Sequence, residues 1–178
     1  DAAGLQCSGT PTYEAYRRHN ANAITFFDNR VPRESIIGEA ALESRLAHLA
    51  LGAPLRLVFG GRLIGMKGVA DLPRVAHDLK RRGVRFSMRI YGTGSLEGAL
   101  QRDIGQLGLA DVVSLQGSLD FRSAWLPLLK AQADLFVCCH PQGDPSSTYS
   151  EVMSCGVPIV GYDNEAFVGV VRESHSGW

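Results

Sequence analysis

A glycine-rich loop that carries two cations is the first segment whose residue types suggest chemistry. It runs from Gly60 to Gly68 and holds Arg62 and Lys67 five residues apart among four glycines. Glycine lets the backbone approach a ligand closely, and an arginine and a lysine on one loop can hold a diphosphate from two sides. A solvated turn is the other interpretation, but a turn alone does not need two cations. The loop therefore predicts phosphate contacts from Gly61, Arg62 and Lys67.

A second glycine turn follows some thirty residues later. Gly92 and Gly94 flank Thr93 directly after an apolar run. A dinucleotide-binding fingerprint would need a third glycine where Glu97 stands, and it would follow the first strand of the core. The pattern therefore favours a tight turn that borders a nucleotide over a site for NAD.

The third segment runs from His140 into an expected helix. Ser147 and Thr148 stand where that helix begins, and free N–H groups at a helix N-terminus bind anions such as phosphate. Glu151 lies one turn further on. Its carboxylate could accept two hydrogen bonds from a ribose, or it could simply complement the helix dipole, and spacing alone leaves these interpretations even. His140 is a proton donor, a sugar contact or only a polar residue at the end of a strand.

Five short apolar runs must position these loops. They are continuous rather than alternating in polarity, which is typical of parallel strands that are covered on both faces. The expected strands are Leu55–Phe59, Phe86–Tyr91, Val112–Gln116, Leu135–Cys139 and Ile159–Tyr162. The three chemical segments each follow one of these strands, and ligands of such sheets bind where the strands end.

Amphipathic stretches separate the expected strands. Apolar side chains recur at helical spacing from Leu72 to Leu79 and from Leu96 to Leu107. A shorter helix is expected around Trp125 to Leu129 with Pro127 in its first turn, and a fourth starts near Ser146 and stops at Gly156. The alternation predicts an α/β fold, a Rossmann-like doubly wound parallel sheet.

Residues 1–54 form a different segment. Thr10 followed by Pro11 predicts the N-cap and first position of a helix, 24–27 predicts a strand, and 34–51 predicts a helix that Gly52 ends. We expect an N-terminal extension or connecting segment here, and one binding domain over residues 55–178.

Charge narrows the possible functions. The 178 residues carry 18 Lys and Arg against 18 Asp and Glu, which excludes a disordered polyelectrolyte, a histone-like nucleic-acid binder and a strongly basic membrane-surface protein. Residues 55–105 nevertheless have a net charge of +6, and residues 106–178 have −5. Part of the basic block, Lys80 to Arg82, ends a helix and complements its dipole. Arg62 and Lys67 remain as the pair directed at an anion.

Cysteine usage and apolar run lengths bear on location. The four cysteines show no CxxC spacing, so a disulfide framework or a zinc site is not expected; they are Cys7, Cys138, Cys139 and Cys155. No apolar run is long enough to cross a membrane, and no secretory signal opens the chain. These features predict a cytoplasmic protein, or a peripheral one at the cytoplasmic membrane face, without a transmembrane segment.

Several strings, in this order and spacing, resemble one known family. They are LVFGGRLIGMKGVADLP, IYGTGSLEGAL, VVSLQGSLDF, ADLFVCC and SEVMSCGVPIVGYDNEAF. They are similar to the C-terminal, nucleotide-sugar-binding domain of group 1 (family 4) glycosyltransferases, which have the two-domain GT-B fold. The resemblance covers residues 55–178, and it implies that this chain is one half of a GT-B fold.

The resemblance also implies roles for individual residues. Arg62 and Lys67 would contact the donor diphosphate and neutralise it as it departs, and Glu151, the second Glu of an E-x7-E motif, would contact the ribose. The first Glu of that motif would stand at Gly143, with Asp144 one place later. Gly143, Asp144 and His140 would face the donor sugar.

The implied activity is transfer of a hexose from a UDP- or GDP-sugar to a hydroxyl acceptor, with retention at the anomeric carbon. The acceptor, a glycan or lipid-linked glycan, would bind an N-terminal domain that these residues lack, so the fragment should bind UDP or GDP weakly and transfer nothing. No cofactor, metal or nucleic acid is implied. Three alternatives stay open: a nicotinamide-dependent dehydrogenase, a GT-B phosphorylase or epimerase, and a non-catalytic nucleotide-sugar-binding module.

Overall fold

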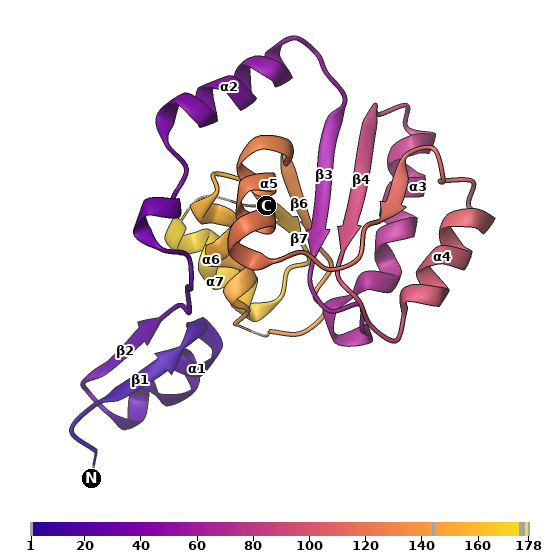
Figure 1. Ribbon diagram of the computed structural model, residues 1–178. Coiled ribbons are helices and arrows are strands. Elements are labelled where there is room, and N and C mark those ends of the chain that lie inside the picture. The colour runs from indigo at the N-terminus through magenta and orange to yellow at the C-terminus, as the bar shows by residue number, and fades with distance from the viewer. Residues whose placement is uncertain (1, 144, 175–176, 178) are drawn as a thin grey trace.

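A five-stranded parallel sheet forms the centre of the molecule (Figure 1). The computed structural model describes residues 2–143, 145–174 and 177. The strands are β3 (Leu55–Gly60), β4 (Phe86–Tyr91), β5 (Val113–Leu115), β6 (Leu135–Cys138) and β7 (Ile159–Gly161). All neighbours pair in parallel, in the order β5-β4-β3-β6-β7. Each predicted strand is confirmed, with its ends shifted by at most one residue.

The strand order reverses direction at β3. The chain runs outward from β3 through β4 to β5 and then returns to the other side of β3 to form β6 and β7. Side chains of neighbouring strands pack in the interior, where the rings of Phe59 and Phe136 stack with their centroids 5.9 Å apart. In sheets of this kind the loops at the carboxyl ends diverge at the reversal, which leaves a crevice there for ligands.

Helices cover the sheet, and each of them except the last has a predicted counterpart. They are α3 (Leu72–Arg81), α4 (Glu97–Gln106), α5 (Leu126–Gln132), α6 (Ser147–Ser154) and α7 (Glu165–Ser174). In Figure 1, α3 and α4 lie together beside β4 and β5, while α5, α6 and α7 lie around β6 and β7. The stripe residues Leu72 and Ala76 of α3, and Leu100 and Ile104 of α4, are buried. No helix among the described residues is both long and apolar enough to cross a membrane.

The short helix predicted around Trp125 has an unexpected start. A single π-helical turn, Phe121–Trp125, leads directly into α5, and Pro127 lies in the first turn of α5 as expected. The Asp120 carboxylate accepts a hydrogen bond from the Ser123 backbone N–H and caps the π turn. Apolar periodicity alone does not reveal the wider turn, which places Phe121 and Trp125 toward the carboxyl ends of the strands.

The N-terminal segment forms a smaller unit. Its elements are β1 (Leu5–Ser8), α1 (Gly9–Tyr16), β2 (Ala23–Phe26), α2 (Glu39–Ala50) and 3-10 turns at Arg17–His19 and Arg33–Ser35. Strands β1 and β2 pair in parallel in a sheet of their own, which extends away from the main sheet in Figure 1.

Two predictions for this segment are wrong in detail. Thr10 does not cap α1, because the helix begins at Gly9 and Ser8 takes the N-cap position. The helix expected from residue 34 starts only at Glu39, because the chain is extended at Ile36 and at Gly38 after the 3-10 turn. The division into a connecting segment and a binding domain stays a prediction.

A buried arginine fastens α2 to the core. Arg45 is 5% exposed, and its guanidinium donates hydrogen bonds to the carbonyls of Leu129, Cys155 and Gly156. Cys155 and Gly156 directly follow α6, and carbonyls at the end of a helix carry partial negative charge. Burial lowers the pKa of Arg45, and the nearby Asp134 carboxylate opposes that shift. The arginine therefore ties the N-terminal segment to the end of the helix that carries Glu151.

A half-buried cation, Arg56, joins the start of β3 to the buried Asp134 just before β6. The Arg56 guanidinium contacts both carboxylate oxygens of Asp134, at 2.7 and 3.0 Å, and the Arg56 backbone N–H donates to the same carboxylate at 2.8 Å. Burial favours the neutral acid, but the hydrogen bonds and charge of Arg56 outweigh it and hold the pKa of Asp134 below its ordinary value. This pair fixes two adjacent strands at the end opposite the predicted site.

We expect Asp134→Asn to lower the free energy of unfolding by about 3 kcal/mol at pH 7, because it leaves the Arg56 charge without its partner. The native pKa is depressed, so the carboxylate stabilises the fold fully above the pKa of an unfolded Asp, about 4, and less as the pH falls through the native pKa. Urea unfolding of both proteins should show the difference shrinking below pH 4.

Asp111→Asn is the matched control for this measurement. Its ion pair with Lys80, at 2.7 Å, is exposed on both sides, so its removal should change stability far less. Equal stability of the wild type and Asp134→Asn at pH 7 would contradict the structural role of the buried pair.

Candidate functional site

A cavity of about 320 Å³ opens at the carboxyl ends of β3 and β4. It lies beside the first turns of α6, and its volume is at the lower end of the range for small-molecule pockets, roughly 300–1,000 Å³. Its lining comes from five separate stretches of chain. The lining residues are Arg30, Gly60, Gly61, Arg62, Tyr91, Gly92, Thr93, Ser118, Leu119, Phe121, Trp125, Thr148 and Glu151.

The loops around this cavity approach each other backbone to backbone. A Cβ on Gly92 would lie 1.9 Å from the carbonyl oxygen of Gly61, and the residue has a φ of +126°. A Cβ on Gly94 would lie 2.4 Å from the Leu63 carbonyl oxygen. These positions therefore require glycine for packing. Gly92 lines the cavity, whereas Gly94 packs against the neighbouring loop; the nucleotide contact of this turn stays a prediction.

Aromatic side chains form one wall of the cavity. The rings of Tyr91 and Trp125 meet edge to face with centroids 5.4 Å apart, and a Cβ on Gly60 would collide with the Trp125 indole at 2.5 Å. Phe121 adds a third ring from the π turn. Sequence reasoning missed these three residues as site residues, because their chemistry is that of the core. The position of Tyr91 could have indicated its role, since it is the last residue of a strand and lies at the edge of the sheet where ligands bind.

The two predicted phosphate-binding cations lie in different surroundings. Arg62 lines the cavity directly after β3, whereas Lys67 stands in the following 3-10 turn and is not among the lining residues. The backbone of that turn packs closely against the residue after β6: a Cβ on Gly68 would lie 1.7 Å from the Cys139 carbonyl oxygen. Burial raises the pKa of the nearby Cys138 thiol, and the charge of Lys67 partly opposes it. The loop thus places Arg62 in the cavity lining and Lys67 outside that lining.

Helix α6 brings two predicted residues into the cavity. Thr148 and Glu151 line it, while Ser147, the first residue of the helix, does not. Ser146 takes the N-cap position; its hydroxyl donates a hydrogen bond to the Thr148 hydroxyl at 3.1 Å and accepts none from a backbone N–H. The Glu151 side chain is only 4% exposed, so a carboxylate sits nearly buried at the cavity wall.

Two of the residues expected to face the donor sugar, His140 and Gly143, are not among the residues that line this cavity. His140 is 2% exposed, its Nδ1 lies 3.4 Å from the Tyr149 hydroxyl, and its carbonyl accepts a hydrogen bond from Asn164. Gly143 packs against Glu165, since a Cβ at position 143 would lie 3.2 Å from that side chain. Asp144 lies outside the described residues. The sugar-binding assignment of these three residues stays a prediction.

The cysteines are buried thiols. Burial raises the pKa of Cys139 to about 12 and that of Cys155 to about 11, so neither is a thiolate at neutral pH. Among the described residues, no group of three or more His, Cys, Asp or Glu side chains is arranged to hold a metal ion. The expectation that the site needs neither metal nor cofactor stays a prediction.

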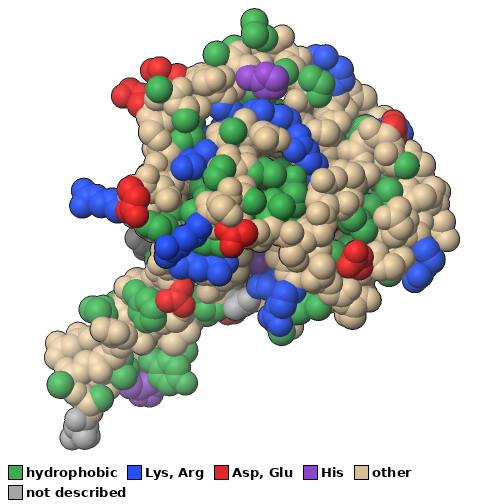
Figure 2. Space-filling view, viewed as in Figure 1, with side chains coloured by type: hydrophobic (Ala, Val, Ile, Leu, Met, Phe, Trp, Pro, Cys, Tyr) green, Lys and Arg blue, Asp and Glu red, His purple; other side chains and the backbone are tan. Residues whose placement is uncertain are grey.

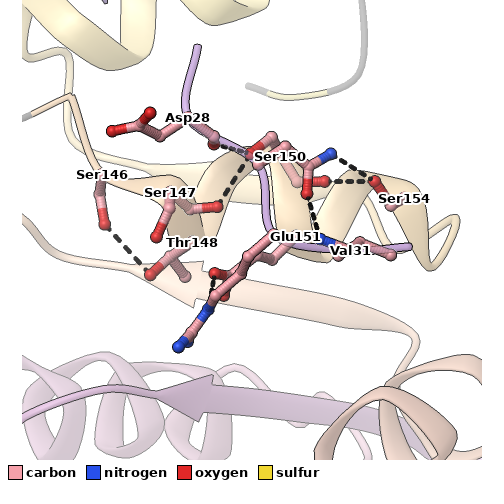
Figure 3. A network of polar contacts seen from close by, with 10 residues as sticks. Asp28, Val31, Ser146, Ser147, Thr148, Ser150, Glu151 and Ser154 are labelled. Atoms are coloured by element: carbon pink, nitrogen blue, oxygen red, sulfur yellow. Dashed lines mark hydrogen bonds and ion pairs between the residues drawn. The ribbon is translucent and has the colours of Figure 1, made fainter. Parts of the chain in front are cut away.

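A stretch of the N-terminal segment runs along α6 and is bonded to it (Figure 3). The Ser150 hydroxyl donates to the Asp28 carbonyl at 2.5 Å, and the Asn29 side-chain amide donates to the Ser154 hydroxyl at 3.2 Å. Further along, the Ile37 backbone N–H donates to the Ser154 carbonyl at 2.9 Å. These contacts join residues more than 100 positions apart in the sequence.

Arg30 extends from this stretch into the cavity. Its Nε donates to Glu151 Oε1 at 2.6 Å, and its guanidinium carbon lies 4.0 Å from the centroid of the Phe121 ring. Figure 2 shows Lys and Arg side chains close to acidic ones on this face, level with the carboxyl ends of the strands. Sequence reasoning missed Arg30, because nothing in its neighbourhood resembles a site motif.

The fold and the position of the cavity define a Rossmann-like α/β domain of the kind that makes up one half of a GT-B protein. A sequence profile of the family described as "Glycosyl transferases group 1" matches residues 43–178, most of the chain. The chain therefore belongs to the group 1 glycosyl transferases. This confirms the resemblance noted from the sequence motifs.

Individual relatives agree with this assignment. A putative colanic acid biosynthesis glycosyltransferase, WcaL of Salmonella typhimurium, is 29% identical over 135 residues, which are 72% of this chain and 33% of WcaL. The crystal structure of WaaG, a glycosyltransferase involved in lipopolysaccharide biosynthesis, aligns with a TM-score of 0.70 at 14% identity over 98% of this chain and 48% of WaaG. Anabaena Alr3699/HepE, crystallised with UDP and glucose, aligns with a TM-score of 0.68 at 16% identity over 99% and 49%.

The lengths of these proteins differ from that of the chain. The chain spans about a third of the length of the curated relatives it matches. The structural alignments show that the fold is shared with half of WaaG and of HepE.

We expect Gly92→Ala to lower the free energy of unfolding by about 2–3 kcal/mol. The backbone conformation at this position, with positive φ, is unfavourable for alanine, and the new Cβ would collide with the Gly61 carbonyl. The melting temperature should fall by roughly 5–10 °C. Gly105→Ala is the matched control, since a Cβ at this position in α4 meets nothing within 4 Å. It should raise stability by about 0.5–1 kcal/mol. Calorimetric melting curves in which both substitutions act alike would contradict the packing argument.

Proposed function

We propose that this chain is the donor-binding part of a retaining glycosyltransferase, which transfers a hexosyl group from a nucleoside diphosphate sugar to a hydroxyl group of an acceptor. The observation that carries the proposal is the cavity itself. It brings Gly61, Arg62 and Gly92 from two strand-ending loops together with Thr148 and Glu151 of α6. The glycine backbone, the guanidinium and the helix N-terminus can bind the diphosphate, and the carboxylate can bind the ribose hydroxyls.

Arg62 and Lys67 act on the leaving group. As the bond between the anomeric carbon and the diphosphate breaks, negative charge grows on the diphosphate oxygens, and cations already in place stabilise that charge without rearranging. Arg62 stands in the cavity wall, and Lys67 lies in the next turn of the same loop. The N-terminus of α6 adds its dipole through Thr148. These groups supply the positive field for which other phosphate-transfer sites use a metal ion.

Glu151 binds the ribose in this proposal. A carboxylate can accept hydrogen bonds from two vicinal hydroxyls, and the resemblance to the family's E-x7-E motif implies this role for Glu151. The proposal keeps the loop after β6, which contains His140, Gly143 and Asp144, as the part of the chain that binds the donor sugar; its support is the family resemblance. UDP is the first nucleotide to test, because solved structures of similar fold were crystallised with UDP.

The acceptor in this proposal is a growing glycan or lipid-linked glycan. The support is the named roles of similar proteins, which include colanic acid and amylovoran biosynthesis. A second, acceptor-binding domain of the whole protein completes the reaction site, and the transfer takes place between the two domains.

Calorimetric titration with UDP, GDP and NAD⁺ tests the proposal. We expect Arg62→Ala and Lys67→Ala each to weaken binding of UDP or GDP by about 10- to 100-fold, the loss that corresponds to a charge-assisted hydrogen bond of about 1.5–3 kcal/mol. Arg82→Ala is the matched control, because it removes the same charge from the exposed end of α3. Its affinity for the nucleotides should match that of the wild type.

Two results would contradict the proposal. One is an affinity for UDP and GDP that neither Arg62→Ala nor Lys67→Ala changes. The other is tight binding of NAD⁺, which would restore the dehydrogenase alternative that the missing third glycine disfavours.

A further inference from the structure

We propose that Arg30 is a positioning residue of the donor site, which holds the Glu151 carboxylate in the orientation that accepts hydrogen bonds from the ribose. The proposal rests on the function proposed above, because it takes Glu151 as the group that binds the ribose. It adds a residue from the N-terminal segment to a site whose predicted members all lie after residue 55. Arg30 also lies outside residues 43–178, the range that the family profile matches.

The Glu151 carboxylate needs a partner because it is buried. Its side chain is 4% exposed, and burying a carboxylate costs free energy unless cations or hydrogen-bond donors replace the water it loses. Within the part of the chain that the structure describes, Arg30 is the hydrogen-bond partner of this side chain, at 2.6 Å from Nε to Oε1. That bond uses one carboxylate oxygen and leaves Oε2 to accept from a ligand.

Arg30 is itself fixed in place. A long side chain that is 66% exposed would ordinarily sample many rotamers. Here the guanidinium lies 4.0 Å from the centroid of the Phe121 ring, a cation–π contact that the π turn makes possible. The preceding residues Asp28 and Asn29 are bonded to Ser150 and Ser154 of α6.

The anchors of this stretch lie on both sides of Glu151 (Figure 3). Asp28 and Asn29 are bonded to residues 150 and 154 of α6, which flank Glu151 along the same helix. These hydrogen bonds therefore fix the position of the Arg30 stretch along the helix that carries Glu151. An ion pair held in this way enters the bound state with little further loss of conformational entropy, which is the advantage of a preorganised site.

A direct contact between Arg30 and the donor phosphates is the competing role, since Arg30 and Arg62 line the same cavity. The two roles differ in the ligand group on which they depend. A positioning role acts through Glu151 and the ribose hydroxyls. A direct role acts on the diphosphate and is indifferent to those hydroxyls.

Calorimetric titration with UDP and with 2′,3′-dideoxy-UDP separates these roles. The full 178-residue chain is compared with Arg30→Ala, Arg30→Lys, Glu151→Gln and the double variant Arg30→Ala/Glu151→Gln. We expect the wild type to bind UDP about tenfold more tightly than the dideoxy analogue, the factor for one hydrogen bond to a charged group. Arg30→Ala should remove most of this preference and leave the affinity for dideoxy-UDP within about twofold of the wild type.

The remaining variants make the test specific. The double variant should show no preference beyond that of Glu151→Gln, because the two residues act as one unit. Arg30→Lys keeps the charge without the planar guanidinium and should keep part of the preference, which allows a conclusion even if Arg30→Ala folds poorly. Arg33→Ala, an exposed arginine three residues further on, is the matched control and should behave as the wild type does.

The outcomes that overturn the inference are distinct. Equal losses of UDP and dideoxy-UDP affinity in Arg30→Ala would show a direct phosphate contact. An unchanged preference in Arg30→Ala, together with its loss in Glu151→Gln, would overturn the role of Arg30 and leave the proposed function intact. A wild type without any preference for UDP would overturn the ribose role of Glu151 and the inference with it.

Discussion

The close approach of strand-ending loops, backbone against backbone, is the constraint on which the site depends. Gly92 passes over the Gly61 carbonyl and Gly68 over the Cys139 carbonyl, at distances that no side chain permits. The loops after β3, β4 and β6 therefore meet at one edge of the sheet, which is where the strand order reverses. The glycines that look like ligand-binding signals in the sequence are in part packing requirements, and the cavity is the space that this packing leaves.

Electrostatic contacts connect this edge to the N-terminal segment. Arg45 donates hydrogen bonds to the carbonyls that follow α6, and Arg30 donates one to Glu151 within the same helix. Both arginines come from residues that precede the main sheet in the sequence. The helix with the candidate ribose-binding carboxylate is therefore positioned by the segment that sequence reasoning treated as a connection. The basic block of residues 55–105 supplies only part of the positive charge around the cavity, because Arg30 lies outside it.

The sequence predicts the sheet well, because continuous apolar runs and helical stripes depend on local spacing. It also predicts Arg62, Thr148 and Glu151 as site residues, and the structure brings these three together in one cavity. It misses Arg30, whose role depends on contacts with residues about 120 positions away, and it misses Phe121, because a π turn leaves no periodic signal. His140 follows a predicted strand and yet is buried against Tyr149, since position in the sequence does not determine which way a side chain points.

The central claim is that the cavity between β3, β4 and α6 binds a nucleoside diphosphate. A crystal structure of the chain grown with UDP tests it most directly. We predict that the diphosphate lies within hydrogen-bond distance of Arg62, and that the ribose hydroxyls contact Glu151 while Arg30 remains paired with it. UDP bound elsewhere on the chain, or bound in the cavity with its ribose turned away from Glu151, would contradict this claim.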